Sequence, residues 1–149
     1  MYIQRTIEKS IDRANKFFPV VLVTGPRQVG KTTVLQNCET QPRTYVSLDT
    51  LENRELAKND PTLFLQRYPA PVLIDEIQYA LELFPYIKAS VDKEKKNGMY
   101  WLTGSQQFHL MKNVSESLAG RVGILQLEGL SQDEKNGHPD VPPFLPTEE

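Results

Sequence analysis

Apolar residues follow two alternating spacings along the chain, one typical of helices and one typical of strands. Ile3, Ile7 and Ile11 recur at helical spacing and predict an amphipathic helix over residues 3–15. Short apolar or alternating runs predict five strands, at residues 20–24, 44–49, 72–74, 99–103 and 122–127. Helical segments are predicted between them, at residues 33–38, 51–59, 60–68, 83–96 and 106–119. This alternation predicts an α/β fold, a doubly wound parallel five-stranded sheet with helices on both faces.

Two of these helices carry signals at their ends. Pro61 lies in the first turn of the predicted helix 60–68, where its missing N–H costs no hydrogen bond. Asn97 and Gly98 follow the predicted helix 83–96, and a glycine just past the last turn is typical of a helix end.

The loop after the first strand carries the strongest chemical signal. Residues 25–32 match G-x-x-x-x-G-K-[ST], the Walker A phosphate-binding loop, between a strand and a helix as the motif requires. Glycine permits the backbone angles that gather N–H groups around phosphate oxygens, at a helix N-terminus that favours anions. The predicted ATP-binding residues are Gly25, Pro26, Arg27, Gln28, Val29, Gly30, Lys31, Thr32 and Thr33.

Two of these residues have specific expected roles. Lys31 can reach the β- and γ-phosphates, where it would also act catalytically, and Thr32 can ligate Mg²⁺ through its hydroxyl oxygen. An acidic pair follows the third strand, where Asp75 and Glu76 end an apolar run. We expect Asp75 to hold Mg²⁺ through water, as a Walker B aspartate does, and Glu76 to polarise an attacking water.

The order of elements indicates a subclass of P-loop NTPase. One strand-helix unit, residues 44–68, separates the Walker A loop from the acidic strand in the sequence. By analogy with the P-loop division that has an additional strand and a catalytic glutamate, strand 44–49 is expected near the sheet edge. The same analogy places strand 99–103 between the two motif strands.

The end of that inserted strand would point at the γ-phosphate. Thr103, Ser105 and Gln106 are candidates to hydrogen-bond the phosphate or the attacking water, and Ser105 is the strongest catalytic candidate of the three. The alternative is a turn in which Ser105 is the N-cap of the next helix. Gln78 and Gln107 are also expected near the site, with weaker arguments.

Composition narrows the setting. The chain has 149 residues, with 17 Lys and Arg against 19 Asp and Glu and a net charge of −2. This balance gives no basic footprint for nucleic acid. No apolar run approaches the roughly 20 residues of a membrane span, and the polar N-terminus lacks a signal peptide. The single Cys38 excludes an internal disulfide. A cytoplasmic protein without membrane contact is expected.

Four motifs together resemble one known family. Gly-Pro-Arg-Gln-Val-Gly-Lys-Thr at 25–32, Leu-Ile-Asp-Glu-Ile-Gln at 73–78, Leu-Thr-Gly-Ser-Gln at 102–106 and Ser-Leu-Ala-Gly-Arg at 117–121 resemble a group of prokaryotic AAA-like P-loop ATPases, described as AAA+ superfamily ATPases or ATP-binding proteins. The resemblance covers about residues 1–135. It implies that Lys31 and Thr32 bind phosphate and Mg²⁺, Asp75 supports Mg²⁺ and Glu76 activates water.

Arg121 has two interpretations. An arginine between a helix and a strand is usually a surface residue. In AAA+ ATPases, however, an arginine just before the fifth strand reaches the nucleotide of a neighbouring subunit and stabilises transition-state charge. The second interpretation makes Arg121 catalytic and makes activity depend on a homo-oligomer or on another protein partner.

The resemblance also bears on domain organisation. Residues 1–130 are expected to form the ATPase domain, and the Pro-rich acidic residues 131–149 a tail or the start of a C-terminal domain. Members of the family usually continue into such a domain, so this chain is expected to be its N-terminal ATPase domain alone.

Three functions compete. The first is Mg-dependent ATP hydrolysis that powers or regulates a partner or an appended domain. The second is a nucleotide-binding switch with little turnover. The third is a small-molecule kinase, which is disfavoured because no Arg-rich lid segment occurs. A GTPase is disfavoured because the Asn-Lys-x-Asp guanine motif is missing.

Overall fold

The computed structural model describes residues 5–26, 30–39, 42–105 and 107–127. Its centre is one sheet of five parallel strands in the order β2-β3-β4-β1-β5. The strands are β1 (Val20–Thr24), β2 (Thr44–Ser47), β3 (Val72–Asp75), β4 (Tyr100–Gly104) and β5 (Val122–Gln126). Both expectations about strand order are confirmed, because β2 is at the edge and β4 lies between β3 and β1.

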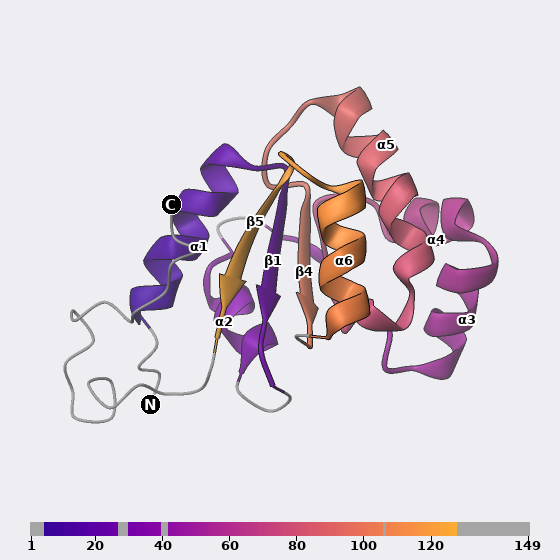
Figure 1. Cartoon of the computed structure of the whole chain (residues 1–149), viewed down its shortest axis with the longest axis horizontal. Coiled ribbons are helices and arrows are strands. Elements are labelled where there is room, and N and C mark those ends of the chain that lie inside the picture. Colours follow the sequence, from indigo (N-terminus) through magenta and orange to yellow (C-terminus); the bar gives the residue numbers. More distant parts are fainter. Residues whose placement is uncertain (1–4, 27–29, 40–41, 106, 128–149) are drawn as a thin grey trace.

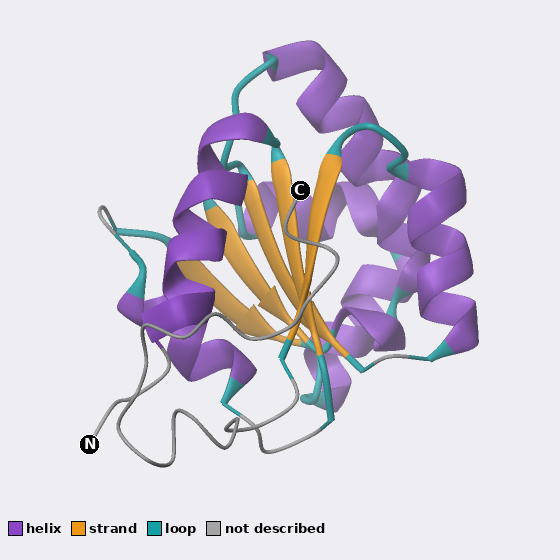
Figure 2. Cartoon of the chain, turned by 60° about the vertical axis from the view of Figure 1, so that its left-hand side comes forward, coloured by secondary structure: helices purple, strands orange, loops and turns teal. Residues whose placement is uncertain are grey.

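Helices cover both faces of this sheet, as Figure 2 shows. The α-helices are α1 (Arg5–Phe17), α2 (Lys31–Asn37), α3 (Leu51–Asn59), α4 (Pro61–Arg67), α5 (Phe84–Glu94) and α6 (Phe108–Ser117). Two 3-10 turns, η1 (Ile77–Tyr79) and η2 (Leu81–Leu83), connect β3 to α5. The predicted doubly wound α/β architecture is therefore confirmed.

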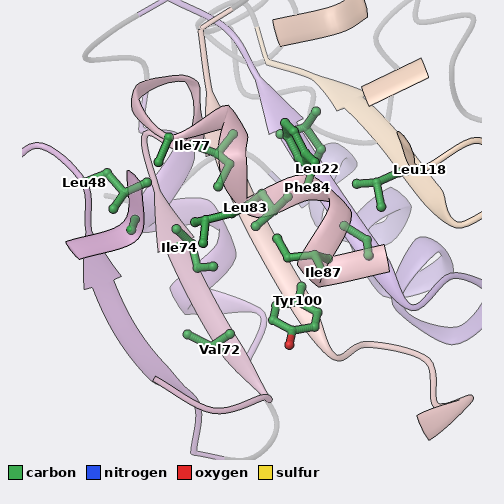
Figure 3. Packing of buried hydrophobic residues seen from close by; sticks show 14 of the residues in the cluster. Leu22, Leu48, Val72, Ile74, Ile77, Leu83, Phe84, Ile87, Tyr100 and Leu118 are labelled. Carbon is green, nitrogen blue, oxygen red and sulfur yellow. The ribbon is translucent and has the colours of Figure 1, made fainter. Parts of the chain in front are cut away.

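Alternate residues of β1, β3, β4 and β5 pack into separate cores. Val21, Val23 and Trp101 pack with the buried residues of α1 and α2 on one face. Leu22, Ile74 and Leu102 pack on the other face with buried residues of α3 to α6, and Figure 3 shows part of that cluster. Both faces are buried, which explains why the strands read as continuous apolar runs. Each such side chain contributes roughly 1.5–3 kcal/mol by leaving water.

Two predicted helix ends were wrong. The predicted helix 83–96 is shorter, because α5 ends at Glu94 and Lys95 takes the left-handed conformation, with a φ of 55°. Gly98 lies beyond this end, and its N–H donates to the carbonyl of Phe18 at 2.9 Å, which joins the start of β4 to the end of α1. Helix α6 begins at Phe108 with Gln107 in the N-cap position, so Ser105 is not its N-cap.

Because the strands are parallel, the segments that follow three of them lie together at the carboxyl ends of the strands, here called the carboxyl edge of the sheet. In Figure 1 the arrowheads of β5, β1 and β4 point the same way, and α2 lies beside them. The segments that follow β1, β3 and β4 carry the motif residues, and they meet at this carboxyl edge, where α/β sheets bind ligands. Among the described residues no helix has the length and apolar character needed to cross a membrane. The predicted tail, residues 131–149, lies outside the described residues.

Candidate functional site

The Walker A loop connects the end of β1 to the start of α2. The N–H of Gly25 donates to the carbonyl of Gly104 at 3.2 Å, which ties the start of the loop to the end of β4. Gly30 is left-handed, with a φ of 88°, and a Cβ built there would have open space within 4 Å. A glycine at this turn therefore leaves room beside the N-terminus of α2. The predicted phosphate-binding residues Arg27, Gln28 and Val29 lie outside the described residues.

Lys31 is folded back onto this loop. Its side chain is 5% exposed, and Nζ donates to the carbonyls of Gly25 and Pro26, each at 2.9 Å. A nearly buried ammonium group beside a helix N-terminus favours an anion at this position. Thr33, the last predicted loop residue, lies in the first turn of α2 and is exposed.

Asp75 is the acceptor at the centre of the site. Its Oδ1 accepts a 2.8 Å hydrogen bond from the hydroxyl of Thr32 and another from the hydroxyl of Thr103. Its Oδ2 accepts from the phenol of Tyr45 at 3.0 Å. Burial, followed by the nearby charge of Asp75, raises the pKa of Tyr45 to about 12, so this phenol stays a donor at neutral pH. Sequence reasoning missed Tyr45, because an outward-facing tyrosine on an edge strand carries no motif.

Thr103 links the two acidic residues. It is fully buried on β4, donates to the Asp75 carboxylate and accepts from the backbone N–H of Glu76 at 2.9 Å. The hydroxyl has one hydrogen, which it donates in the hydrogen bond to Asp75. Thr103 is one of the three candidates for contact with the phosphate or the attacking water, and in the structure its hydroxyl contacts Asp75 and Glu76.

Glu76 has an unusual backbone for a residue with a side chain. Its φ of 63° and ψ of 54° are left-handed, and it is 9% exposed. Such a conformation costs on the order of 1–3 kcal/mol and is concentrated at functional sites. Hydrogen bonds hold it on both sides, from its N–H to Thr103 and from the N–H of Tyr79 to its carbonyl at 3.2 Å.

The Glu76 side chain is connected to the end of β4. Gln78 Nε2 donates to Glu76 Oε1 at 2.8 Å, and Gln78 Oε1 accepts from the N–H of Ser105 at 3.2 Å. The hydroxyl oxygen of Ser105 is buried and has no hydrogen-bond partner among the residues that the structure describes. Sequence reasoning gave Gln78 a weak argument, and Gln106 lies outside the described residues. Gln107 is exposed.

Arg121 lies at the opposite ends of the strands, beside the amino end of β1. Its carbonyl accepts from the N–H of Val20 at the start of β1, at 3.1 Å, and its guanidinium forms two hydrogen bonds with Asp92, at 2.7 and 3.1 Å. The hydrogen bond from Arg121 lowers the pKa of Asp92. A five-residue strand spans roughly 16 Å, so Arg121 is that far from the loop of its own chain. It is the one predicted catalytic residue that the fold does not bring to the site.

The residues present at the carboxyl edge fit a nucleotide with a magnesium ion. Thr32 and Asp75 offer adjacent hard oxygens of the kind that Mg²⁺ prefers. The turn at Gly30 is open, and the Ser105 hydroxyl is a buried polar atom that finds no partner within the described part of the chain. A lysine ammonium group, two hydroxyl groups and two carboxylates are thus grouped at one edge of the sheet.

Comparisons with known proteins agree with this geometry. A family model described as an AAA domain matches residues 17–136. Over 130 residues the chain is 36% identical to uncharacterized proteins of Mycobacterium bovis and of Mycobacterium tuberculosis, covering 86% of this chain and 29% of each relative. It therefore spans less than a third of the length of these curated relatives.

A solved structure shares the fold. The crystal structure of a DNA replication initiation factor matches with a TM-score of 0.56 and 14% sequence identity, covering 88% of this chain and 46% of that one. The family match covers most of the chain, and the sheet order and the Walker A connection agree with it. The chain belongs to the AAA domain family, and it has the fold of an AAA-like P-loop ATPase domain.

Proposed function

We propose that this domain binds ATP together with Mg²⁺ and hydrolyses its terminal phosphoanhydride bond, and that the cycle powers or regulates a protein partner or a further domain. The observation that carries the proposal is the 2.8 Å contact between Thr32 and Asp75, with Lys31 and Glu76 as their sequence neighbours. This contact groups an anion-binding cation, two oxygen ligands for a metal and a carboxylate that can accept a proton.

Each residue has a distinct proposed role. The N–H groups of the loop and Lys31 would hold the β- and γ-phosphates, and Thr32 and Asp75 would hold Mg²⁺. The ion supplies positive charge against the phosphate oxygens when bound. Glu76 would accept a proton from water as the water oxygen bonds to the γ-phosphorus. The bond from that phosphorus to the bridging oxygen breaks, and ADP carries the electron pair away.

One alternative is a nucleotide-binding switch with little turnover. It is favoured by the position of Arg121, which is paired with Asp92 at the far edge and does not reach the site of its own chain. An arginine that stabilises transition-state charge is worth about 10³- to 10⁵-fold in rate in related mechanisms. A single chain without one would bind ATP and hydrolyse it slowly.

Nucleotide binding and phosphate release in the same samples test both functions. We expect the wild type to bind ATP in the presence of Mg²⁺ and Lys31→Ala to lose most of that binding, because the ammonium that now lies against the loop carbonyls would turn to the phosphates. GTP is included as the competing nucleotide. No ATP binding by a folded wild-type chain would contradict the proposal in both forms.

Glu76→Gln separates hydrolysis from switching. The amide keeps the shape of the side chain and removes its capacity as a base, so we expect ATP binding to persist and phosphate release to fall by about 10²- to 10⁴-fold. The matched control for the Lys31→Ala variant of the binding test is Lys9→Ala, which removes a lysine from the exposed face of α1. Binding without any wild-type release would favour the switch over the ATPase.

The object of the ATP cycle, the assembly of the chain and its location are also part of the proposal. The curated relatives are much longer than this chain, and a partner domain in a longer protein would be the object of the ATP cycle. Assembly of several copies would be required if Arg121 acts on a neighbour. The cytoplasm, which holds ATP and Mg²⁺, is the proposed location.

A further inference from the structure

Gln78 makes two hydrogen bonds that no sequence motif assigns. Its amide Nε2 donates to Glu76 Oε1 at 2.8 Å, and its Oε1 accepts from the N–H of Ser105 at 3.2 Å. A carboxylate oxygen can only accept and a backbone N–H can only donate, so these partners fix which end of the amide is which. The Gln78 amide therefore acts both as a hydrogen-bond donor and as a hydrogen-bond acceptor.

We propose that Gln78 is the positioning residue of Glu76: its amide fixes one carboxylate oxygen of Glu76, aims the other at the attacking water, and ties this orientation to the end of β4. The inference rests on the proposed function, in which Glu76 accepts the proton. Gln78 does not itself contact the reacting atoms.

The surroundings of Gln78 keep its amide in place. A Cβ built on Gly104 would lie 3.1 Å from Gln78 Oε1, 2.7 Å from a methyl carbon of Leu110 and 3.3 Å from a methyl carbon of Ile77. The amide is thus packed directly against the backbone of β4, at a position where a side chain has no room. Ile77, which precedes Gln78 in η1, is fully buried and anchors the same turn.

The connection matters because each end carries a different part of the site. The Glu76 end carries the proposed base, on a left-handed residue whose backbone is held by Thr103. The Ser105 end carries a buried hydroxyl that has no partner in residues 5–26, 30–39, 42–105 and 107–127, at the strand end that faces the proposed γ-phosphate position. A movement of Ser105 toward a ligand would be transmitted through the Gln78 amide to the orientation of Glu76.

Two substitutions separate the two hydrogen bonds. Gln78→Glu keeps an oxygen that accepts from Ser105 N–H but replaces the donor to Glu76 by a second oxygen. Gln78→Ala removes both contacts. We expect at least a 10-fold fall in kcat for both variants, with the KM for ATP changed less than about twofold, because the contact orients the base rather than the nucleotide.

The pH dependence identifies the missing donor. A carboxylate introduced beside Glu76 takes up a proton more readily as the pH falls, because like charges disfavour the ionised pair, and a protonated carboxyl can donate again. The kcat of Gln78→Glu relative to wild type should therefore rise as the pH is lowered, while the ratio for Gln78→Ala stays flat. Amide hydrogen exchange of Ser105 should remain slow in Gln78→Glu and become faster in Gln78→Ala.

A matched control and two contrary outcomes complete the test. Gln66→Ala, an exposed glutamine on α4, should leave kcat and KM unchanged. If wild type hydrolyses ATP and Gln78→Glu stays within twofold of its kcat, the positioning role is overturned while the ATPase function stands. If the folded wild-type chain releases no phosphate, the proposed function fails, and the positioning role fails with it.

Discussion

The hydroxyl of Thr32 donates a 2.8 Å hydrogen bond to the carboxylate of Asp75, although the strands that precede these residues are not neighbours. Thr32 lies in α2, directly after the loop from β1, and Asp75 ends β3, with β4 between the two strands. The contact therefore bridges β4 at the carboxyl edge of the sheet. Thr103 lies on β4, between β1 and β3, and donates to the same carboxylate oxygen.

Removing the Thr32 hydroxyl should weaken the response to Mg²⁺. Thr32→Val keeps the branched shape of the side chain, and we expect about 10-fold or greater loss of Mg²⁺-stimulated ATP binding because a hard oxygen ligand is lost. Titration of ATP binding against Mg²⁺ measures the effect. Thr32→Ser restores the hydroxyl and should restore most of the response, and an unchanged Mg²⁺ titration in Thr32→Val would argue against this metal site.

Thr103 is expected to stabilise the folded chain. Thr103→Val leaves the shape nearly unchanged but removes the acceptor for the Glu76 N–H and one donor to Asp75. Because the position is fully buried, the free energy of unfolding should fall by about 1–3 kcal/mol, measured by urea denaturation. Thr103→Ser should lose less. A valine variant as stable as wild type would show that the two hydrogen bonds of this hydroxyl make no net contribution to stability.

Arg121 should act only on a neighbouring copy, if it acts on nucleotide at all. Arg121→Ala would then lower turnover by more than 10-fold, and so would Glu76→Gln. In such an assembly one copy supplies Arg121 and its neighbour supplies Glu76 to the same site. Mixing the two inactive chains should restore activity, because some sites would combine the Glu76 of one copy with the Arg121 of another. No recovery at any mixing ratio would leave Arg121 as a surface residue.

Asp92 provides the control for that experiment. Its carboxylate is the ion-pair partner of Arg121, and the two side chains are 47% and 32% exposed. Exposed pairs of this kind contribute little to stability. Asp92→Ala should therefore leave the Tm nearly unchanged and turnover no lower than wild type. A large loss of turnover in Asp92→Ala would mean that Asp92 holds Arg121 in its active position.

Cys38 should be unreactive at neutral pH. Burial, followed by the charges of Glu8 and Asp12, raises the pKa of this thiol from 9.0 to about 12, which leaves about 1,000-fold less thiolate at pH 8. Alkylation by iodoacetamide should be at least about 100-fold slower in the native chain than in urea. Equal rates would show that the end of α2 opens freely.

The chain's own local patterns were sufficient for the fold. Continuous apolar strands between amphipathic helices indicate a sheet covered on both faces, and the five strands are where the patterns placed them. The wrong end of the predicted helix 83–96 involves a non-local contact. Gly98 looked like a helix end, but its N–H is used to join α1 to the start of β4, and the helix had already ended at Glu94.

The site divides in the same way. The residues of the Walker A pattern and the Asp75–Glu76 pair are each contiguous in sequence, so local spacing was enough to predict roles for them. Tyr45 contacts Asp75, 30 residues away, and Gln78 contacts Ser105, 27 residues away, and no periodicity reports which side chains meet across parallel strands. The position of Arg121 at the amino ends of the strands follows from its place just before β5, but its ion pair with Asp92 was visible only in the structure.

The sequence by itself determined the classes of element and the phosphate-binding chemistry, because helical and strand periodicities and a glycine-rich loop are local properties of the chain. The tertiary structure alone decided the partners of each acidic residue. Parallel packing set β4 between β1 and β3, and this order placed Thr103 against Asp75 and Gln78 against Ser105. Hydrogen bonds at the site depend on distances across the sheet, which only the packed cores fix.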